Sequence, residues 1–124
     1  KVKIDTSQLK LADCSGVSRY TLTSSDQIIS LLTWVYNSKH KEEFISTLPG
    51  GGWPKSTLEK RLINEGDKVR AKTGGLSGVR NLAGFIESPK YGPVAFSILM
   101  NGYIGASSKY GYVQDQIVKT IVYD

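Results

Sequence analysis

Four consecutive residues, Lys72, Thr73, Gly74 and Gly75, place an ammonium group, a hydroxyl group and bare backbone side by side. If they end a strand at a sheet edge, the free backbone N–H and C=O groups can hold an extended peptide as an added strand. Lys72 would then put a positive charge beside a carboxylate or a reacting hydroxyl, and Thr73 would offer a hydroxyl donor. The glycines allow close approach, and a backbone N–H there could stabilise an oxyanion. The tripeptide Lys72–Gly74 alone favours a solvated basic strand face with a glycine bulge, because short motifs have a high false-positive rate.

Other catalytic chemistries find little support in the sequence. Cys14 is the only cysteine, so an internal disulfide and a cysteine-based zinc site are excluded, and we expect a buried, inert thiol. His40 is the only histidine and lies in a charged run, which argues against Ser-His-Asp or Cys-His catalysis within this chain. No metal-ligand spacing occurs, so we expect no metal and no cofactor.

Length and charge limit the class of protein further. The 124 residues suffice for one domain, and 40% apolar with 22% charged residues is typical of a globular chain. The net charge of +5 is spread out, without the basic, aromatic-rich stripe that single-stranded nucleic acid requires. No apolar run approaches the ~20 residues of a membrane helix, so we expect no membrane span. The chain opens on Lys1 with no signal-peptide pattern, and we expect it to be a segment of a longer protein.

The first half predicts mainly helices around loops. A capping box of Ser24 with Gln27 begins a helix, whose apolar stripe comprises Ile28, Leu31, Leu32, Val35 and Tyr36. A second capping box, Ser56 with Glu59, predicts a helix over 56–65 that ends at Gly66. We also expect a short strand over 8–13, a short helix over 41–48 and a glycine-rich connection over 49–54.

The second half predicts three strands and a last helix. Residues 67–73 alternate, with Val69, Ala71 and Thr73 on one face and Lys68, Arg70 and Lys72 on the other. Residues 78–87 and 93–101 are apolar on both faces, as in inner strands, and the turn over 88–92 makes them a hairpin. A helix follows from 107 or 108 to 122, with Val113, Ile117 and Ile121 expected inward. Short connections favour antiparallel pairing, so the predicted class is α+β: an antiparallel sheet with helices on its faces.

Longer stretches of sequence around Lys72–Gly74 make this short motif a more specific indication of a protein family. K-T-G is one of three catalytic elements of the penicillin-recognising serine enzymes. The chain also resembles the D-alanyl-D-alanine carboxypeptidase/endopeptidase family, the class C low-molecular-mass penicillin-binding proteins, in several segments that occur in family order. These segments are "DCSGVSRYTLTSSDQIISLL", "FISTLPGGGWPKSTLEKRL", "KVRAKTGGLSGVRNLAGFI" and "VAFSILMNGY".

The resemblance implies a fold and an activity. The fold would be a five-stranded antiparallel sheet between helices, of the penicillin-binding-protein and β-lactamase type, with the active site along one edge strand. The activity would be hydrolysis of D-Ala-D-Ala or cross-link bonds of peptidoglycan peptides through a serine acyl-enzyme outside the cytoplasm, in the bacterial periplasm or cell envelope. β-Lactams would acylate the same serine. Lys72 would be catalytic, Thr73 would bind the substrate carboxylate beside Gly74, and the N–H of Gly75 would be an oxyanion donor.

The chain departs from the family pattern at several points. Gly75 stands where the family usually has Thr or Ser, Cys14 replaces a glycine and Thr21 replaces an asparagine. No S-x-N occurs, and the two S-x-x-K matches, Ser7–Lys10 and Ser38–Lys41, lie in a strand-like stretch and at a helix end. Neither is suited to an activated serine, which needs a base beside it. We therefore expect residues 1–124 to be the C-terminal portion of a D,D-peptidase catalytic domain, inactive without its missing N-terminal part.

Three other interpretations remain open from the sequence. One is a β-lactamase or esterase of the same superfamily. Another is a non-catalytic peptidoglycan-binding module in which Lys68, Arg70 and Lys72 form a carboxylate-binding stripe. The least supported is a basic nucleic-acid binder, whose affinity would fall steeply with salt.

Overall fold

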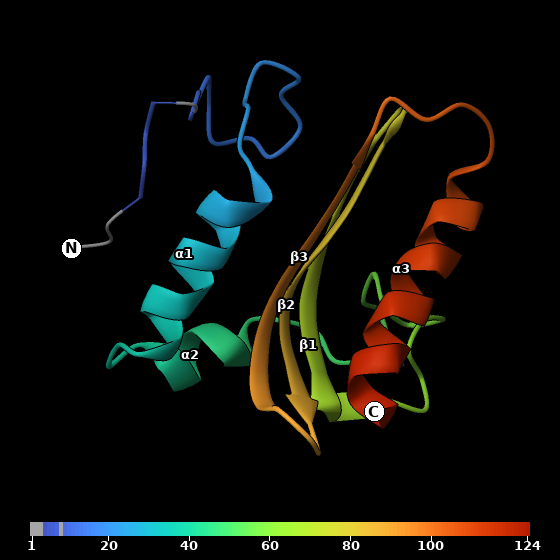
Figure 1. Cartoon of the computed structure of the whole chain (residues 1–124). Helices are drawn as coiled ribbons and strands as arrows, with labels where there is room; N and C mark the ends of the chain where they lie inside the picture. The colour runs from blue at the N-terminus through green and yellow to red at the C-terminus, as the bar shows by residue number, and fades with distance from the viewer. Residues whose placement is uncertain (1–3, 8) are drawn as a thin grey trace.

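The computed structural model describes residues 4–7 and 9–124 and has a three-stranded antiparallel sheet in its centre. Strands β1 (Val69–Leu76), β2 (Val79–Ser88) and β3 (Gly92–Asn101) follow one another in space in their sequence order. Helices α1 (Ser25–Tyr36) and α2 (Lys41–Ser46) lie on one side of the sheet and α3 (Ser107–Tyr123) lies on the other (Figure 1). The predicted α+β class, the hairpin over 88–92 and the three strands are confirmed.

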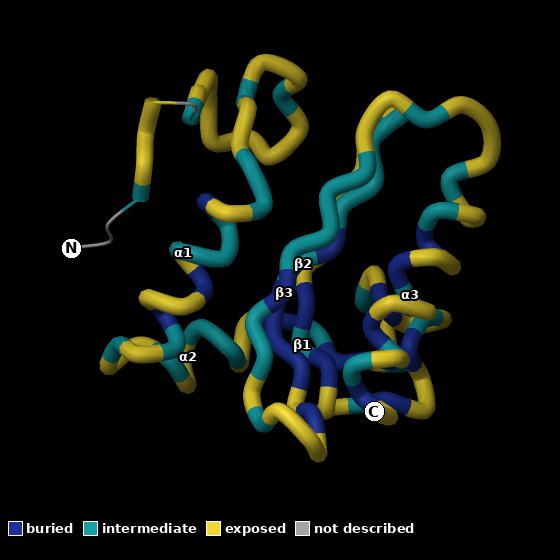
Figure 2. Tube along the Cα trace, viewed as in Figure 1, coloured by how far each residue is buried: buried dark blue, intermediate teal, exposed yellow. Residues whose placement is uncertain are grey.

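Helix α1 begins where the sequence predicts. The hydroxyl of Ser24 accepts a hydrogen bond from the Gln27 N–H, and the Gln27 side-chain oxygen accepts one from the Ser24 N–H. Helix α1 packs on β3, and its Leu32 shares a cluster with Leu48 and Phe85. This smaller cluster covers part of one sheet face, and the strand segments above it are mainly of intermediate burial (Figure 2).

The larger core lies between the sheet and α3. It contains the fully buried side chains of Leu58, Leu82, Ile86 and Val118 among its members, and the sheet centre is the most buried region of the trace (Figure 2). Gln114 is also fully buried: its amide N–H donates to the Arg80 carbonyl of β2, and its oxygen accepts from Arg61. A buried amide with both ends bonded fixes the position of α3 along the sheet.

Three sequence predictions are wrong in this part of the molecule. The predicted strand over 8–13 is reduced to one bridge between Lys10 and Leu22, and residue 8 lies outside the described residues. Residues 56–65 form turns, not a helix. On α3, Ile121 packs against the core as predicted, but Val113 and Ile117 are exposed, and the buried side chains are those of Gln114, Val118 and Val122.

Tertiary contacts explain the two helix errors. Around the predicted 56–65 helix, Lys55 and Leu62 have positive φ angles, and the Gly52 N–H binds the carbonyls of Leu58 and Arg61. This packing overrides helix propensity. On α3, the Arg61 guanidinium binds Asp115 at 2.8 Å and the Gly111 carbonyl. That ion pair, only slightly exposed, turns a polar face of α3 toward the core, which hydrophobic periodicity alone does not indicate.

Gly84 lets β1 approach β2 closely. A Cβ at Gly84 would overlap the Arg70 carbonyl oxygen and lie 2.6 Å from the Ala71 Cα. By contrast, a Cβ at Gly74 would meet only the Asn81 side chain, 3.6 Å from its Cβ, which is an ordinary contact.

We therefore expect Gly84→Ala to destabilise the protein by roughly 1–3 kcal/mol, because overpacking forces backbone to shift. Gly74→Ala is the matched control and is expected to lower the melting temperature much less. Thermal unfolding of both variants checks this, and equal melting temperatures would contradict it.

Candidate functional site

The outer edge of β1 differs between its two halves. On its inner side β1 pairs with β2 along its whole length, from Val69 opposite Ile86 to Leu76 opposite Val79. On the outer side, the Ala71 N–H donates to the Pro49 carbonyl at 3.0 Å, and Gly50 forms a bridge with Arg70. In the part of the chain that the structure describes, no backbone group pairs with the outer edge from Lys72 to Leu76.

Alternation along the strand assigns the groups on this open edge. Because the Ala71 N–H points outward, the backbone groups of residues two and four positions later, Thr73 and Gly75, point outward too. The Lys72 ammonium donates to the Thr73 carbonyl at 2.6 Å, which agrees with an outward carbonyl there. The open edge therefore presents the N–H and C=O groups of Thr73 and Gly75, the arrangement that an added peptide strand requires.

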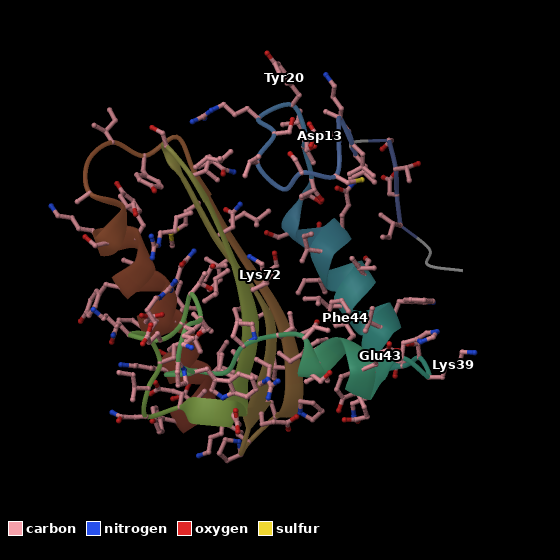
Figure 3. The ribbon with its side chains drawn as sticks, turned by 180° about the vertical axis from the view of Figure 1, so that it is seen from behind. Asp13, Tyr20, Lys39, Glu43, Phe44 and Lys72 are labelled. Carbon is pink, nitrogen blue, oxygen red and sulfur yellow. The ribbon has the colours of Figure 1, made fainter. Side chains whose placement is uncertain are left out.

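The side chains of Lys72 and Thr73 leave the strand on opposite faces. Lys72 pairs with Ala83, which packs on the α1 side, whereas Thr73 pairs with Leu82 in the core beneath α3. Lys72 is exposed, and Figure 3 shows it about halfway along the sheet, between the loop that carries Asp13 and the helix that carries Phe44. The predicted alternation is confirmed, and the amine and the alcohol flank the same edge from two sides.

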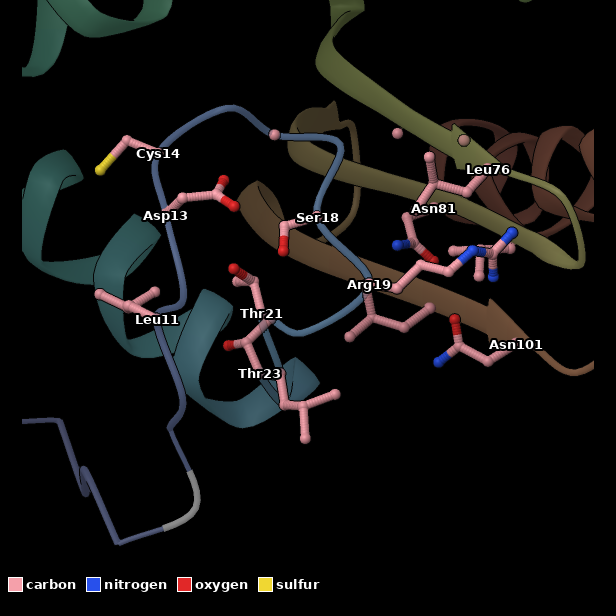
Figure 4. Close-up of a pocket in the computed structure, with 16 residues that line it drawn as sticks. Leu11, Asp13, Cys14, Ser18, Arg19, Thr21, Thr23, Leu76, Asn81 and Asn101 are labelled. Atoms are coloured by element: carbon pink, nitrogen blue, oxygen red, sulfur yellow. The ribbon is translucent and has the colours of Figure 1, made fainter.

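A cavity of about 620 Å³ adjoins this edge at its Leu76 end. One wall is the loop over 11–23, and the other comprises Gly74, Gly75 and polar residues of β2 and β3, notably Asn81 and Asn101 (Figure 4). The Asn81 side-chain oxygen accepts from the Met100 N–H, which orients its amide beside Gly74. The cavity therefore offers polar groups to a ligand that extends past the two glycines.

The loop over 11–23 is held by short local hydrogen bonds. Asp13 accepts from both the hydroxyl and the N–H of Ser15, and these bonds lower the pKa of the Asp13 carboxyl below its usual value. Arg19 donates to the Ser77 carbonyl at 3.0 Å, which ties the loop to the β1–β2 turn. An ionised carboxylate and a guanidinium thus belong to the same cavity wall.

Several sequence expectations need correction here. Cys14 is exposed and lines the cavity, not buried as expected, because its loop lies on the surface. Arg70 is not a solvated cation: its Nε donates to the Leu48 carbonyl, and its guanidinium lies 4.2 Å from the Trp53 ring. The sequence did not single out Arg19, Asn81 or Asn101. Two signals were available: Arg19 lies within the family-like loop segment, and Asn81 interrupts an apolar strand.

The two S-x-x-K matches are not arranged as catalytic pairs. Ser38 donates to the Val35 carbonyl, and the Lys41 ammonium lies 3.9 Å from the centre of the Tyr36 ring. Ser7 lies in a turn and its N–H binds Asp5, whereas Lys10 is bridged to Leu22. Among the described residues, no three His, Cys, Asp or Glu side chains gather where they could hold a metal ion, and no helix is long and apolar enough to cross a membrane.

Solved structures resemble this chain closely. Penicillin-binding protein 4 (DacB) from Haemophilus influenzae, in complex with a β-lactam, superposes with a TM-score of 0.84 at 28% identity, over 98% of this chain and 30% of that one. A second crystal structure of the same protein gives a TM-score of 0.83 at 28% identity, over 98% of this chain and 28% of that one. The chain therefore has the fold of part of a penicillin-binding protein.

Sequence relatives agree with the structural match. A D-alanyl-D-alanine carboxypeptidase from Actinomadura sp. is 35% identical over 82% of this chain, and DacB from Haemophilus influenzae is 38% identical over 75%. Penicillin-sensitive carboxypeptidase A from Dictyostelium discoideum is 31% identical over 94%. The chain spans 20% of the length of the first two relatives and 24% of the third. The model of the D-Ala-D-Ala carboxypeptidase 3 (S13) family matches residues 1–121, and the chain belongs to this family.

Proposed function

We propose that this chain is the substrate-binding segment of a serine-type D-Ala-D-Ala carboxypeptidase that acts on peptidoglycan peptides through an acyl-enzyme. The observation that carries the proposal is the open outer edge of β1 between Lys72 and Leu76, beside an exposed amine and a cavity lined in part by polar side chains. Membership of the D-Ala-D-Ala carboxypeptidase 3 family supports the reaction class.

In this proposal the substrate peptide binds as a strand along the open edge. Lys72 is the catalytic cation, which orients protons and the substrate carboxylate, and Thr73 binds that carboxylate through its hydroxyl. Gly74 and Gly75 leave the backbone uncovered, and the outward N–H of Gly75 donates to the oxyanion. A preorganised donor of this kind stabilises the charge that develops on the carbonyl oxygen. In the resting structure the Lys72 amine is bound to the Thr73 carbonyl, so binding of the peptide would displace it.

The serine nucleophile would come from another part of the protein. Ser7 and Ser38 make local bonds and have no lysine positioned as a base, which favours an S-x-x-K and an S-x-N outside residues 1–124. Two further features suit a larger catalytic domain. The outer edge of β3 has no strand partner among the described residues, so the additional strands of a five-stranded sheet would fit there. Val113 and Ile117 are also 45% and 42% exposed on the outer face of α3.

The proposed partners follow from the same site. They are peptidoglycan stem peptides as substrates, β-lactams as inhibitors that acylate the serine, and the remaining part of the same protein. Such substrates place the reaction outside the cytoplasm, in the periplasm or cell envelope. A β-lactamase or esterase with the same site remains the alternative. The purely peptide-binding alternative is weakened because Arg70 is bonded to α2 and stacked on Trp53, so Lys68, Arg70 and Lys72 do not form a shared stripe.

The isolated chain is expected not to react with penicillin, since Ser7 and Ser38, the serines of its S-x-x-K matches, have no lysine positioned as a base. Incubation with a fluorescent penicillin followed by intact-protein mass spectrometry measures this. A stoichiometric covalent adduct would show that the nucleophile lies within residues 1–124.

In the full-length protein, Lys72→Ala is expected to lower the rate of acylation by penicillin by about 10²–10³-fold, as does the loss of one preorganised charge or donor. Lys68→Ala removes the same charge from the exposed end of the neighbouring short helix (Gly66–Lys68) and is the matched control, with a rate close to wild type. Stopped-flow acylation kinetics compare the two. A Lys72→Ala rate within about threefold of wild type would remove this residue from the reaction.

A further inference from the structure

We propose that the Pro49–Gly50 backbone is a specificity device that stops a bound peptide at its carboxyl terminus. It would admit a peptide only when the main chain of that peptide ends at the residue beside Lys72. This inference rests on the function proposed above and assigns a role to the glycine-rich connection over 49–54.

This obstacle, the backbone of Pro49 and Gly50, is called the stop below, and it lies on the same edge as the proposed peptide site. The Pro49 carbonyl accepts from Ala71, and Gly50 pairs with Arg70, so these two residues already occupy the position that an added strand would take there. Thr73 is the next residue whose backbone groups point outward. A peptide paired with Thr73 and Gly75 therefore meets Pro49 and Gly50 if its main chain continues past Thr73 toward Ala71.

The segment is held rigidly in this position. A Cβ at Gly50 would lie 2.6 Å from both the Asp67 Oδ1 and the Trp53 Nε1, so both side chains pack directly on its Cα. The Trp53 indole N–H donates to Asp67 at 2.7 Å, and the Arg70 guanidinium stacks over the Trp53 ring. Next along the chain, the Gly51 N–H donates to the Gly66 carbonyl at 3.0 Å. An obstacle that is bonded on several sides excludes a ligand group and does not move aside for it.

Charge and space fix the direction of the peptide. The exposed amine of Lys72 lies next to the stop, whereas the cavity lined by Gly74, Gly75 and Leu76 lies at the other end of the open edge. An acidic terminus therefore belongs beside Lys72, and the rest of the peptide extends toward the cavity. This peptide runs antiparallel to β1. A leaving residue with a bulky side chain can still be accepted, since the stop blocks only continuation of the main chain.

Three peptide substrates of the full-length protein separate the stop from the charge requirement. They are a peptide that ends in free D-Ala-D-Ala, its C-terminal amide, and the same peptide extended by one glycine. The amide and the extended peptide both lack the carboxylate on the leaving residue, but only the extension meets Pro49 and Gly50. Measured as release of D-Ala-Gly, which reports cleavage between the two D-alanines, the extended peptide is expected to have a kcat/KM at least about tenfold below that of the amide, since a rigid site discriminates by such factors.

Loosening the stop is expected to reduce this discrimination. Trp53→Ala removes the ring that packs on Gly50. It should lower the ratio of kcat/KM for the amide to kcat/KM for the extended peptide, with little change in kcat/KM for the free acid. Trp34→Ala is the matched control, because Trp34 is 39% exposed and Trp53 is 37% exposed, and it should leave the ratio unchanged. Trp53→Phe keeps a ring but loses the bond to Asp67, and its ratio should lie between those of wild type and Trp53→Ala.

The outcomes of the experiment distinguish the two proposals. A wild-type protein that fails to be acylated by penicillin would overturn the proposed function. Suppose that acylation is normal but that wild type cleaves the D-Ala-D-Ala bond of the extended peptide with the same kcat/KM as that of the amide. The proposed stop is then wrong, and this conclusion does not depend on how any variant folds. A Trp53→Ala protein with wild-type acylation and an unchanged ratio would also overturn the proposed stop.

Discussion

The division of one strand edge governs how this molecule can work. Strand β1 has a single inner partner, and its outer edge is closed by Pro49 and Gly50 as far as Ala71 and open from Lys72 onward. Free backbone groups at a sheet edge readily pair with any available strand, so proteins usually protect them. Here half of the edge is protected by the chain itself, and the other half carries the amine, the hydroxyl and the two glycines. The placement of the open half, rather than the identity of any one residue, makes a peptide site there physically reasonable.

The remaining elements keep that edge in position. Gly84 allows β1 to lie close against β2, and the buried Gln114 ties α3 to the Arg80 carbonyl. Arg80 pairs with Gly75 across the strands and extends beneath Gly111 of α3, where it donates to the Ser107 hydroxyl. The helix on the far face is therefore connected through β2 to the glycine whose N–H lies on the open edge. These buried polar contacts hold α3 in one position against β2.

Polar groups near the edge are distributed unevenly, and this gives the site a direction. At the closed end, Arg70 is bonded to the Leu48 and Ile45 carbonyls and lies 3.6 Å from the Asp67 carboxylate, so Lys72 is the exposed cation nearest the stop on this strand. At the open end, the Asp13 carboxylate and the Arg19 guanidinium line a cavity with Asn81. A ligand with an acidic terminus and a longer polar body matches both ends. Pro49 and Gly50 give a bound peptide the same direction, because they occupy the edge beside Arg70 and Ala71.

The sequence by itself determined the strands, the hairpin, the capped helix α1 and the family, because these depend on local periodicity, capping residues and ordered motifs. It also singled out residues 72–75, whose types are unusual for a strand end. Only the tertiary structure decided that this strand is an edge, that Pro49 and Gly50 close half of it, and that the 11–23 loop meets it across a cavity. Those features depend on contacts between residues distant in sequence. The same cause explains the errors at 56–65 and on α3, where the Arg61–Asp115 pair and packing around Gly52 outweighed the local pattern.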